Sequence, residues 1–278
     1  MLPFALAPVK SEAPTIAMTT TAASAPAEPP APALTLTGER TLPGIADEAY
    51  WFTRHVVAYR LAATRARGAV VLDAGCGEGY GADLLRRAGA DRVVAIDNDR
   101  AVVAHVASTC AYVEALHADL SALPLPAASV DLIVSLQVIE HLPDVPRYLS
   151  ELRRVLRPGG ELVLTTPNRL TFTPEGAPLN PFHVREFSPD ELRSELTAAG
   201  LRPGALLGVH HGPTLRASER LWRRPLADVL TSGPPHTWPR PVRRLVHRTR
   251  PEWFRVRADR LDDALDLVAL VRVPREAT

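Results

Sequence analysis

The chain has 278 residues, of which 46% are hydrophobic and 23% charged, and its formal net charge is +1. These values are typical of globular proteins and disfavour bulk binding to nucleic acid. No apolar run approaches the roughly 18–20 residues that span a bilayer, and the N-terminus lacks the regions of a signal peptide. Cys76 and Cys110 cannot form a disulfide framework. Membrane spanners and secreted disulfide scaffolds are therefore excluded, and a cytoplasmic location is predicted.

The first 37 residues differ from the rest of the chain. They hold seven prolines and ten alanines and few large apolar side chains. Such a segment cannot bury enough surface to offset the conformational entropy lost on folding. We therefore predict a disordered tail over residues 1–37, in which Met18 is an alternative start of translation.

Apolar periodicity predicts the elements that follow. Aromatic and aliphatic residues at helical spacing over 48–66 predict a helix within an N-terminal cap over 38–68, which either packs on the sheet edge or acts as a lid. Short apolar runs then alternate with helical segments, which predicts an α/β fold with a parallel sheet covered on both faces. The predicted strands are 69–72, 92–96, 112–117, 130–136, 161–166, 201–209 and 265–273, and the predicted helices are 79–88, 100–108, 146–156 and 189–199, with a turn at 158–160.

The connection between the last two predicted strands is unusually long and basic. Residues 216–260 hold twelve arginines against four acidic residues. A connection of this length is typical of a functional or mobile segment. We predict a lid or insertion at about 211–262 within a domain that covers 69–278. Its charge fits either a solvated surface or a lid that favours an anionic partner.

The most informative motif follows the first predicted strand of the sheet. VLDAGCGEGYG places Asp73, Gly75, Gly77 and Gly79 in a D-x-G-x-G-x-G turn between a strand and a helix. Glycines are needed where the backbone turns tightly and approaches a ligand without Cβ atoms in the way. The turn alone fits a tight connection, a dinucleotide site or another nucleotide-like cofactor.

The ends of the next strands narrow this choice. Asp97 ends the second strand about twenty positions after the turn, where an acidic side chain binds a ribose diol. Asp99 is better placed to cap the following helix. Asp119 and Leu120 end the third strand, where they can meet an adenine amino group.

These motifs together resemble the class I S-adenosylmethionine-dependent methyltransferases. VLDAGCGEGYG, AIDND, ADLSALPLP, DLIVSLQVIEHLPD and LRPGGELVLTTPN occur in family order over about residues 69–168. The resemblance implies a Rossmann-like, mostly parallel sheet of seven strands with the seventh antiparallel, and S-adenosyl-L-methionine as the cofactor. The cofactor-binding residues that it implies are Asp73, Gly75, Gly77, Gly79, Asp97, Asp119, Leu120 and Gln137.

A narrower resemblance covers about residues 34–278. LTLTGERTLPGIADEAYWFTRHVVAYRLA, APLNPFHVREFSPDEL and LDDALDLVALVRV are similar to actinobacterial sugar methyltransferases, a group that includes the mycofactocin oligosaccharide methyltransferase and the methyltransferase of the methylglucose lipopolysaccharide locus. It implies O-methylation of a hydroxyl in a glucose-containing oligosaccharide. The same core fits methylation of a quinone, a polyketide or another small molecule, and a non-catalytic cofactor-binding protein. A nucleotide-dependent oxidoreductase and a nucleic-acid methyltransferase are disfavoured, because the motifs after the third strand do not fit them.

Methylation of an alcohol requires a group that takes the hydroxyl proton, and histidine is the usual general base near pH 7. Ligands of open α/β sheets lie beyond the carboxyl ends of the strands. His183, after the fifth strand, is the predicted base. His141, after the fourth, is either the second candidate or a structural residue whose hydrogen bond shapes the loop. Arg185, Glu186 and His211 are predicted to contact the acceptor. No close-spaced ligand motif predicts a metal site.

Overall fold

Strands and helices alternate along the chain, as the apolar pattern predicts. The computed structural model describes residues 41–176 and 179–275, so the predicted tail over 1–37 and the alternative start at Met18 lie outside the described residues. The strands are β1 (Val70–Ala74), β2 (Arg92–Asp97), β3 (Glu114–His117), β4 (Val130–Leu136), β5 (Leu156–Pro167), β6 (Pro203–His211), β7 (Phe254–Arg257) and β8 (Asp266–Arg272).

The helices connect these strands. They are α1 (Ala49–Ala63), α2 (Tyr80–Arg87), α3 (Arg100–Thr109), α4 (Val145–Val155), α5 (Arg169–Phe172), α6 (Pro189–Ala198), α7 (Pro213–Trp222), α8 (Leu226–Thr231) and α9 (Arg240–Val246). Short 3-10 helices are η1 (Ala46–Glu48), η2 (Ile139–His141), η3 (Pro235–Thr237), η4 (Pro251–Trp253) and η5 (Leu261–Asp263).

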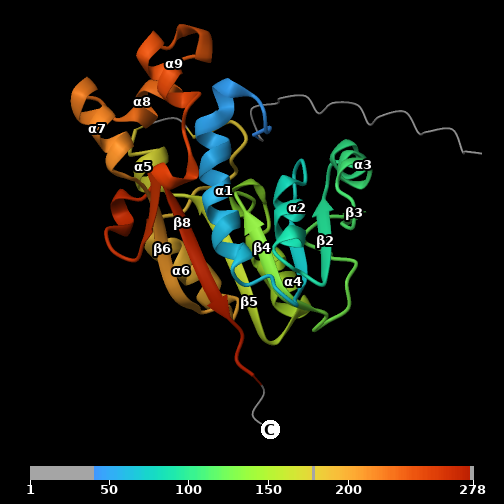
Figure 1. Ribbon diagram of the computed structural model, residues 1–278. Helices are drawn as coiled ribbons and strands as arrows, with labels where there is room; N and C mark the ends of the chain where they lie inside the picture. Colours follow the sequence, from blue (N-terminus) through green and yellow to red (C-terminus); the bar gives the residue numbers. More distant parts are fainter. Residues whose placement is uncertain (1–40, 177–178, 276–278) are drawn as a thin grey trace, which may run out of the picture. The chain divides into compact units, whose positions relative to one another are not determined.

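The described strands form one sheet in the order β3-β2-β1-β4-β5-β8-β6-β7 (Figure 1). The first five strands of the chain are parallel, and β8 lies antiparallel between β5 and β6. This is the predicted Rossmann-like, mostly parallel arrangement. Because β1 lies between β2 and β4, the connections from β1 and β4 diverge and leave a crevice at the carboxyl ends of these strands.

The sheet differs from the prediction in one strand and one turn. It has eight strands in the described residues rather than seven, because β7 pairs antiparallel with the outer edge of β6, where Val209 faces Val256. β7 lies inside the long connection that the sequence predicts as a lid or insertion. The predicted turn at 158–160 lies within β5, as an irregularity in its pairing with β4.

Apolar side chains cover both faces of the parallel strands, because successive residues of a strand point to opposite sides. Val71 and Val93 join the apolar cluster that includes side chains of α1, α2 and α3. Leu72 and Val94 join the cluster that includes side chains of α4 and α6. Figure 1 shows α1 in front of the sheet and α6 behind it. With both faces covered, the strand ends are where a polar ligand can bind.

Side-chain caps fix where two helices begin. The Asp99 carboxylate accepts the N–H of Ala101 at 2.9 Å at the start of α3, which confirms the predicted cap. Ser188 and Glu191 form a reciprocal capping box at the start of α6. The loop that precedes α6 carries His183, and the capping box fixes where this loop ends.

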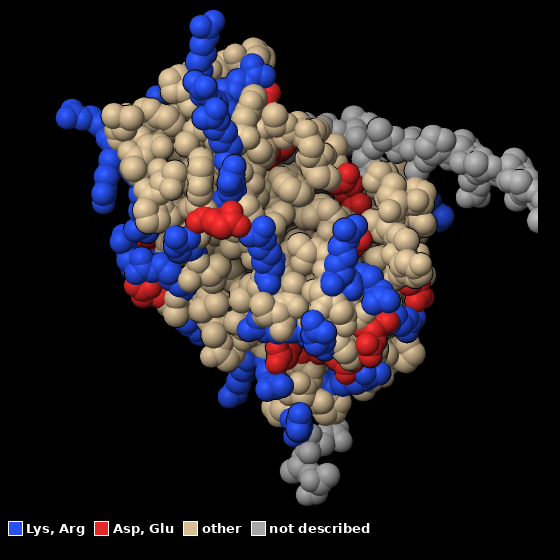
Figure 2. Space-filling view, in the orientation of Figure 1, with Lys and Arg blue, Asp and Glu red and all other residues tan. Residues whose placement is uncertain are grey.

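The 211–262 segment contains α7, α8, α9 and β7. It packs on α1, since the Tyr50 hydroxyl lies 2.7 Å from Nε2 of His211 and the Tyr50 ring lies 5.6 Å from that of Phe254. Arg243 of α9 and His247, which follows α9, both pair with Asp47. Basic side chains lie over the upper part of Figure 2, where Figure 1 places α7 and α9.

Two further observations concern the cysteines and the membrane. Cys76 and Cys110 are both buried free thiols. Within residues 41–176 and 179–275, no helix combines the length and the apolar character needed to cross a membrane.

Candidate functional site

Three glycines with positive φ angles shape the turn after β1. These angles are 79° at Gly75, 50° at Gly77 and 87° at Gly79. A Cβ atom on Gly75 would lie 2.4 Å from Val138 Cγ2, and one on Gly79 would lie 2.8 Å from Val106 Cγ2. A Cβ atom on Gly77 would meet nothing within 4 Å, and Gly77 borders a cavity. The outer two glycines therefore permit packing of the turn, whereas Gly77 leaves room for a ligand.

This cavity lies at the carboxyl ends of β1, β2 and β4. Its wall combines the glycine turn with polar and apolar side chains from several segments. Six of the eight predicted cofactor residues line it, whereas Asp73 and Gly79 do not. The lining residues are Thr41, His55, Tyr59, Gly75, Cys76, Gly77, Glu78, Tyr80, Asp97, Asn98, Asp119, Leu120, Leu136, Gln137, Val138, His141 and Leu142.

Two carboxylates line the cavity from neighbouring strands. Asp97 Oδ2 accepts the N–H of Gly77 and Asp97 Oδ1 accepts the N–H of Asp99, each at 3.0 Å. These bonds fix the carboxylate against the turn, and each oxygen keeps a second lone pair for a ligand hydroxyl. Asp119 is exposed and accepts the N–H of Ser121 at 2.8 Å, which holds the pKa of Asp119 below its usual value. Asp119 is therefore ionised at neutral pH.

Tyr59 separates the cavity from the buried carboxyl group of Asp73. Its hydroxyl donates to Asp73 Oδ1 at 3.2 Å. Burial raises the pKa of Asp73 to about 7, although the bond from Tyr59 acts in the opposite direction. The tyrosine ring fits here because residue 81 is glycine, where a Cβ atom would lie 2.0 Å from Tyr59 Cζ. Tyr59, rather than Asp73, therefore faces the cavity.

Gln137 follows β4 in a left-handed conformation that is uncommon for a residue other than glycine, with φ 57°. Its Nε2 donates to Thr165 Oγ1 at 3.2 Å and to Asp266 Oδ1 at 3.3 Å. Asp266 also forms a buried ion pair with Arg54 of α1, whose Nε donates to Oδ2 at 3.0 Å. These contacts hold the strained backbone in place and tie α1 to the cavity wall.

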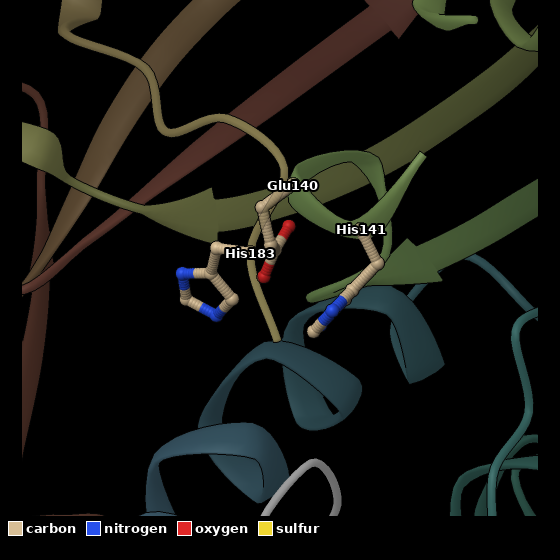
Figure 3. Close-up of side chains that lie close together, drawn as sticks. All are labelled: Glu140, His141 and His183. Carbon is tan, nitrogen blue, oxygen red and sulfur yellow. The ribbon is translucent and has the colours of Figure 1, made fainter. Parts of the chain in front are cut away.

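A second group of polar side chains lies beside the cavity, where η2 meets the loop that precedes α6 (Figure 3). Glu140, His141 and His183 each offer one ligand atom, and these atoms lie within 4.8 Å of one another. The N–H groups of Val184 and Arg185 donate to the carbonyl oxygen of Glu140 at 2.8 and 3.2 Å, which holds the loop against η2. Because His141 also lines the cavity, the group adjoins the cofactor crevice.

Oxygen atoms orient both histidines of this group. His183 Nδ1 lies 2.7 Å from Glu186 Oε1, and the two side chains are only 7% and 0% exposed. His141 Nδ1 lies 2.8 Å from the carbonyl oxygen of Phe182. The Phe172 ring stacks on His183, with the ring centres 5.6 Å apart. When an oxygen accepts from Nδ1–H, the lone pair of a neutral imidazole is on Nε2, which can take a proton or a metal ion.

Glu140 is fully buried and only partly satisfied by hydrogen bonds. Its Oε2 accepts the hydroxyl of Thr166 at 3.0 Å, whereas its Oε1 has no hydrogen-bond partner among the described residues. Burial raises the pKa of Glu140 to about 8. A buried carboxyl group with an unsatisfied oxygen is costly, so a proton or a cation is expected to compensate it.

Two of the predicted acceptor-binding residues make other contacts. Arg185 Nη1 donates to Glu195 Oε1 at 2.7 Å. His211 Nε2 lies 2.7 Å from the Tyr50 hydroxyl, and its Nδ1 lies 2.9 Å from Glu219 Oε1. Neither residue lines the cavity. Of the residues predicted to act on the acceptor, the structure therefore brings together His141, His183 and Glu186.

Sequence reasoning missed Glu78 and Glu140 as site residues. Glu78 occupies a variable position of the glycine turn and lines the cavity, and burial raises its pKa to about 7. The sequence leaves open whether α1 packs on the sheet or covers the site. In the structure it does both, since Tyr50 packs in the core and His55 lines the cavity. His55 Nδ1 lies 3.2 Å from the Tyr80 hydroxyl, and burial lowers the pKa of His55 to about 4. The signal for Glu140 was its place beside His141 after β4.

Comparison with known proteins decides between the cofactor classes that the turn allows. Residues 72–164 match a family model described as a methyltransferase domain. The chain is 46% identical over 248 residues to a probable S-adenosylmethionine-dependent methyltransferase of Mycolicibacterium smegmatis, covering 87% of this chain and 96% of the relative. A probable S-adenosylmethionine-dependent methyltransferase of Mycobacterium tuberculosis H37Rv is also 46% identical, and the match covers 87% of this chain and 90% of that relative. The chain belongs to the S-adenosylmethionine-dependent methyltransferases.

Solved structures of other proteins have the same fold as this methyltransferase. A chain in the complex of the Haloferax volcanii Trm112 methyltransferase activator with a methyltransferase matches it with a TM-score of 0.57 at 19% identity, over 84% of this chain and 96% of the other. The predicted class I fold is therefore confirmed, with β7 as an additional strand.

S-adenosyl-L-methionine is the cofactor of this family, and the cavity fits it. The open Cβ position at Gly77 leaves space beside the main chain of the turn. Asp97, at the end of β2, keeps lone pairs for a diol. Both features are compatible with S-adenosyl-L-methionine, which carries a ribose diol.

Proposed function

We propose that this methyltransferase methylates a sugar hydroxyl of a glucose-containing oligosaccharide. The observation that carries the proposal is the His183–Glu186 pair, which lies beside His141 at the edge of the cofactor cavity. An alcohol must lose its proton as the new bond to carbon forms, and an imidazole oriented by a buried carboxylate can take it. The likeness of the segments outside the core to sugar methyltransferases supports a sugar as the acceptor.

The cavity residues are assigned to parts of the cofactor. Asp97 would accept from the two ribose hydroxyls, and Asp119 would accept from the adenine amino group beside Leu120. The main chain of the glycine turn would hold the methionine part, with Asp73 acting from behind the wall through Tyr59. The residues proposed to bind the cofactor are Asp73, Gly75, Gly77, Gly79, Asp97, Asp119, Leu120 and Gln137.

S-adenosylmethionine supplies a methyl group that its sulfonium charge has already activated. The protein's own residues therefore have to align the acceptor, exclude water and receive a proton. His183 can hold a proton at Nε2, since its Nδ1 is paired with Glu186. His141 lies beside it, with the ring centres 5.0 Å apart, and is the second candidate. Phe172, stacked on His183, shields this imidazole on one side.

A small apolar acceptor, such as a quinone precursor or a polyketide, is the second candidate. Large apolar side chains are exposed on the two segments that carry Phe172 and His183, and exposed apolar groups next to a site favour an apolar ligand. These side chains are Leu170, Leu179, Phe182 and Val184, which are 40 to 57% exposed.

Calorimetric titration with S-adenosylhomocysteine, with NADH as the control, tests the cofactor assignment. We expect micromolar binding of S-adenosylhomocysteine and no binding of NADH. The protein with S-adenosylmethionine is then given either glucose oligosaccharides or phenolic quinone precursors, and the products are analysed by mass spectrometry. Methylation of the oligosaccharides supports the proposal, whereas methylation of the phenols alone would replace it. Binding without methylation of either class would favour a non-catalytic cofactor-binding protein.

A further inference from the structure

Glu140, His141 and His183 have the composition and spacing of a metal site. Two imidazoles and one carboxylate offer ligand atoms within 4.8 Å of one another. Figure 3 shows the Glu140 carboxylate between the two imidazole rings. The ligand atoms of a tetrahedral divalent ion lie about 3.4 Å apart at the usual metal–ligand distances of about 2.0–2.1 Å. Side-chain rotations that bring the three ligand atoms closer together would let them bind one ion.

The oxygen atoms beside Nδ1 of the two histidines orient both rings in the way that is common for metal ligands. Metal-binding histidines commonly donate their other ring N–H to a carboxylate or a carbonyl oxygen, which fixes the tautomer and the ring orientation. His183 has this arrangement with the Glu186 carboxylate at 2.7 Å, and His141 has it with the Phe182 carbonyl oxygen at 2.8 Å. In both rings, Nε2 then carries the lone pair that a cation needs.

An unsatisfied buried oxygen is a second, independent indication. Glu140 is 0% exposed, and its Oε1 has no hydrogen-bond partner in the part of the chain that the structure describes. Oε2 of the neighbouring Glu186 is also buried without a partner there. No arginine or lysine of the described residues forms an ion pair with either carboxylate. Two buried carboxylates beside two imidazoles favour a bound cation as the compensating charge.

We propose that Glu140, His141 and His183 bind a divalent transition-metal ion that has an open coordination position toward the cofactor cavity. Imidazole ligands favour ions such as Zn²⁺, Co²⁺ or Fe²⁺ over Mg²⁺ and Ca²⁺, which prefer oxygen ligands. Three protein ligands with one open position are typical of catalytic rather than structural sites. His141 lines the cavity and so gives the direction of the open position.

The role of the ion rests on the proposed function, although its binding does not. A hydroxyl bound to such an ion is more acidic than a free one, as is metal-bound water, so its proton can pass to water at neutral pH. The hydroxyl oxygen then forms a bond to the methyl carbon while the bond from that carbon to sulfur breaks. The products are the methyl ether, S-adenosylhomocysteine and the released proton. In this case His183 binds the ion through Nε2, so the ion, and not His183 as a general base, promotes the loss of the hydroxyl proton.

The test is a titration of the metal-free, full-length protein with Co²⁺, in the absence of cofactor and acceptor. Visible absorption of Co²⁺ reports its protein ligands directly. We expect one ion to bind and excess Zn²⁺ to displace it. Because loss of an outer-shell partner already lowers metal affinity by about 10–100-fold, Glu140→Gln and His183→Ala are each expected to lower it by more than about 100-fold. The control is His236→Ala, which removes an exposed histidine of η3.

Binding of S-adenosylhomocysteine to the same samples shows whether each variant is folded. Glu140→Gln nearly preserves the size of the side chain and keeps an oxygen that can accept from Thr166. The proposal is overturned if the wild-type protein binds no Co²⁺, or if Glu140→Gln binds Co²⁺ as the wild type does.

The activity measurement distinguishes this proposal from the proposed function. Because the Co²⁺ titration uses no acceptor, the absence of oligosaccharide methylation leaves its result unchanged. If an acceptor is found, we expect chelation to lower the rate at least tenfold and Zn²⁺ or Co²⁺ to restore it. A full rate in the chelated protein would overturn the role of the ion and leave His183 as the general base.

Discussion

The cofactor cavity and the proposed acceptor side, which is the group of Glu140, His141 and His183, are assembled in different ways. On the cofactor side, the Gly77–Asp97 hydrogen bond spans 20 positions, the length of one strand–helix unit. In the group proposed to act on the acceptor, the His141–Phe182 contact spans 41 positions. The contact between the glycine turn and Asp97 thus follows from a local pattern. Gln137, which donates to Asp266 129 positions away, and the proposed acceptor side depend on tertiary packing. The comparison implies that the two sides can be disrupted separately.

The largest expected effect is on the acceptor side. Removing a proton-accepting or hydroxyl-activating group typically costs a factor of 10²–10⁴ in rate, so we expect His183→Ala to lower kcat by about 10²–10³-fold. The affinity for S-adenosylhomocysteine should stay within twofold, because His183 does not line the cofactor cavity. The measurements are kcat with the identified acceptor and calorimetry, with His236→Ala as the control. A loss of cofactor affinity in His183→Ala would mean that the two sides are coupled.

The second prediction concerns the cofactor side. Asp97→Ala removes the carboxylate proposed to accept from two ribose hydroxyls. Charge-assisted hydrogen bonds contribute about 1.5–3 kcal/mol each, so we expect binding of S-adenosylhomocysteine to weaken by about 2–4 kcal/mol in calorimetry. Asp119→Ala is the matched control, because that carboxylate is exposed and is expected to contribute less. Unchanged affinity in Asp97→Ala would remove this residue from the ribose site.

The same comparison explains what the sequence could predict. The glycine turn and Asp97 follow strands whose apolar runs are unmistakable, so their place at one sheet edge follows from parallel-strand geometry. Glu140 was missed as a site residue, because His183, which lies beside it in the folded chain, comes from a loop more than forty positions away. A search for close-spaced metal ligands could not detect such a group. β7 was missed because four residues give little periodic signal, although FRVR does alternate apolar and charged residues.

The third prediction concerns pH and is specific to the cofactor side. Burial raises the pKa of Asp73 to about 7 in the folded protein, against about 3.9 in an unfolded chain. Between these values the unfolded chain has lost the proton that the folded protein keeps, so the free energy of unfolding falls as the pH rises. At about 1.4 kcal/mol per pKa unit, the fall between pH 5 and pH 7 is roughly 2 kcal/mol.

Asp73→Asn provides the control for this pH effect. Asparagine does not titrate and keeps an oxygen that can accept from the Tyr59 hydroxyl. Urea unfolding of the cofactor-free protein at pH 5, 6 and 7 would measure the difference between the two proteins at each pH. We expect the stability of the variant relative to the wild type to increase with pH. A difference that is constant across this range would mean that Asp73 is not protonated in the folded protein.

The smallest expected effect is that of Arg185→Ala, and it tests where the acceptor side ends. The Arg185 guanidinium donates to Glu195 at 2.7 Å and lies 4.6 Å from the centre of the Phe187 ring, so it is directed toward α6. Exposed ion pairs of this kind contribute about 0–1 kcal/mol. We therefore expect the stability to change by less than about 1 kcal/mol, and KM for the acceptor by less than about threefold. A KM raised more than tenfold at unchanged kcat would show that Arg185 leaves Glu195 to bind the acceptor, in which case the acceptor side extends over α6.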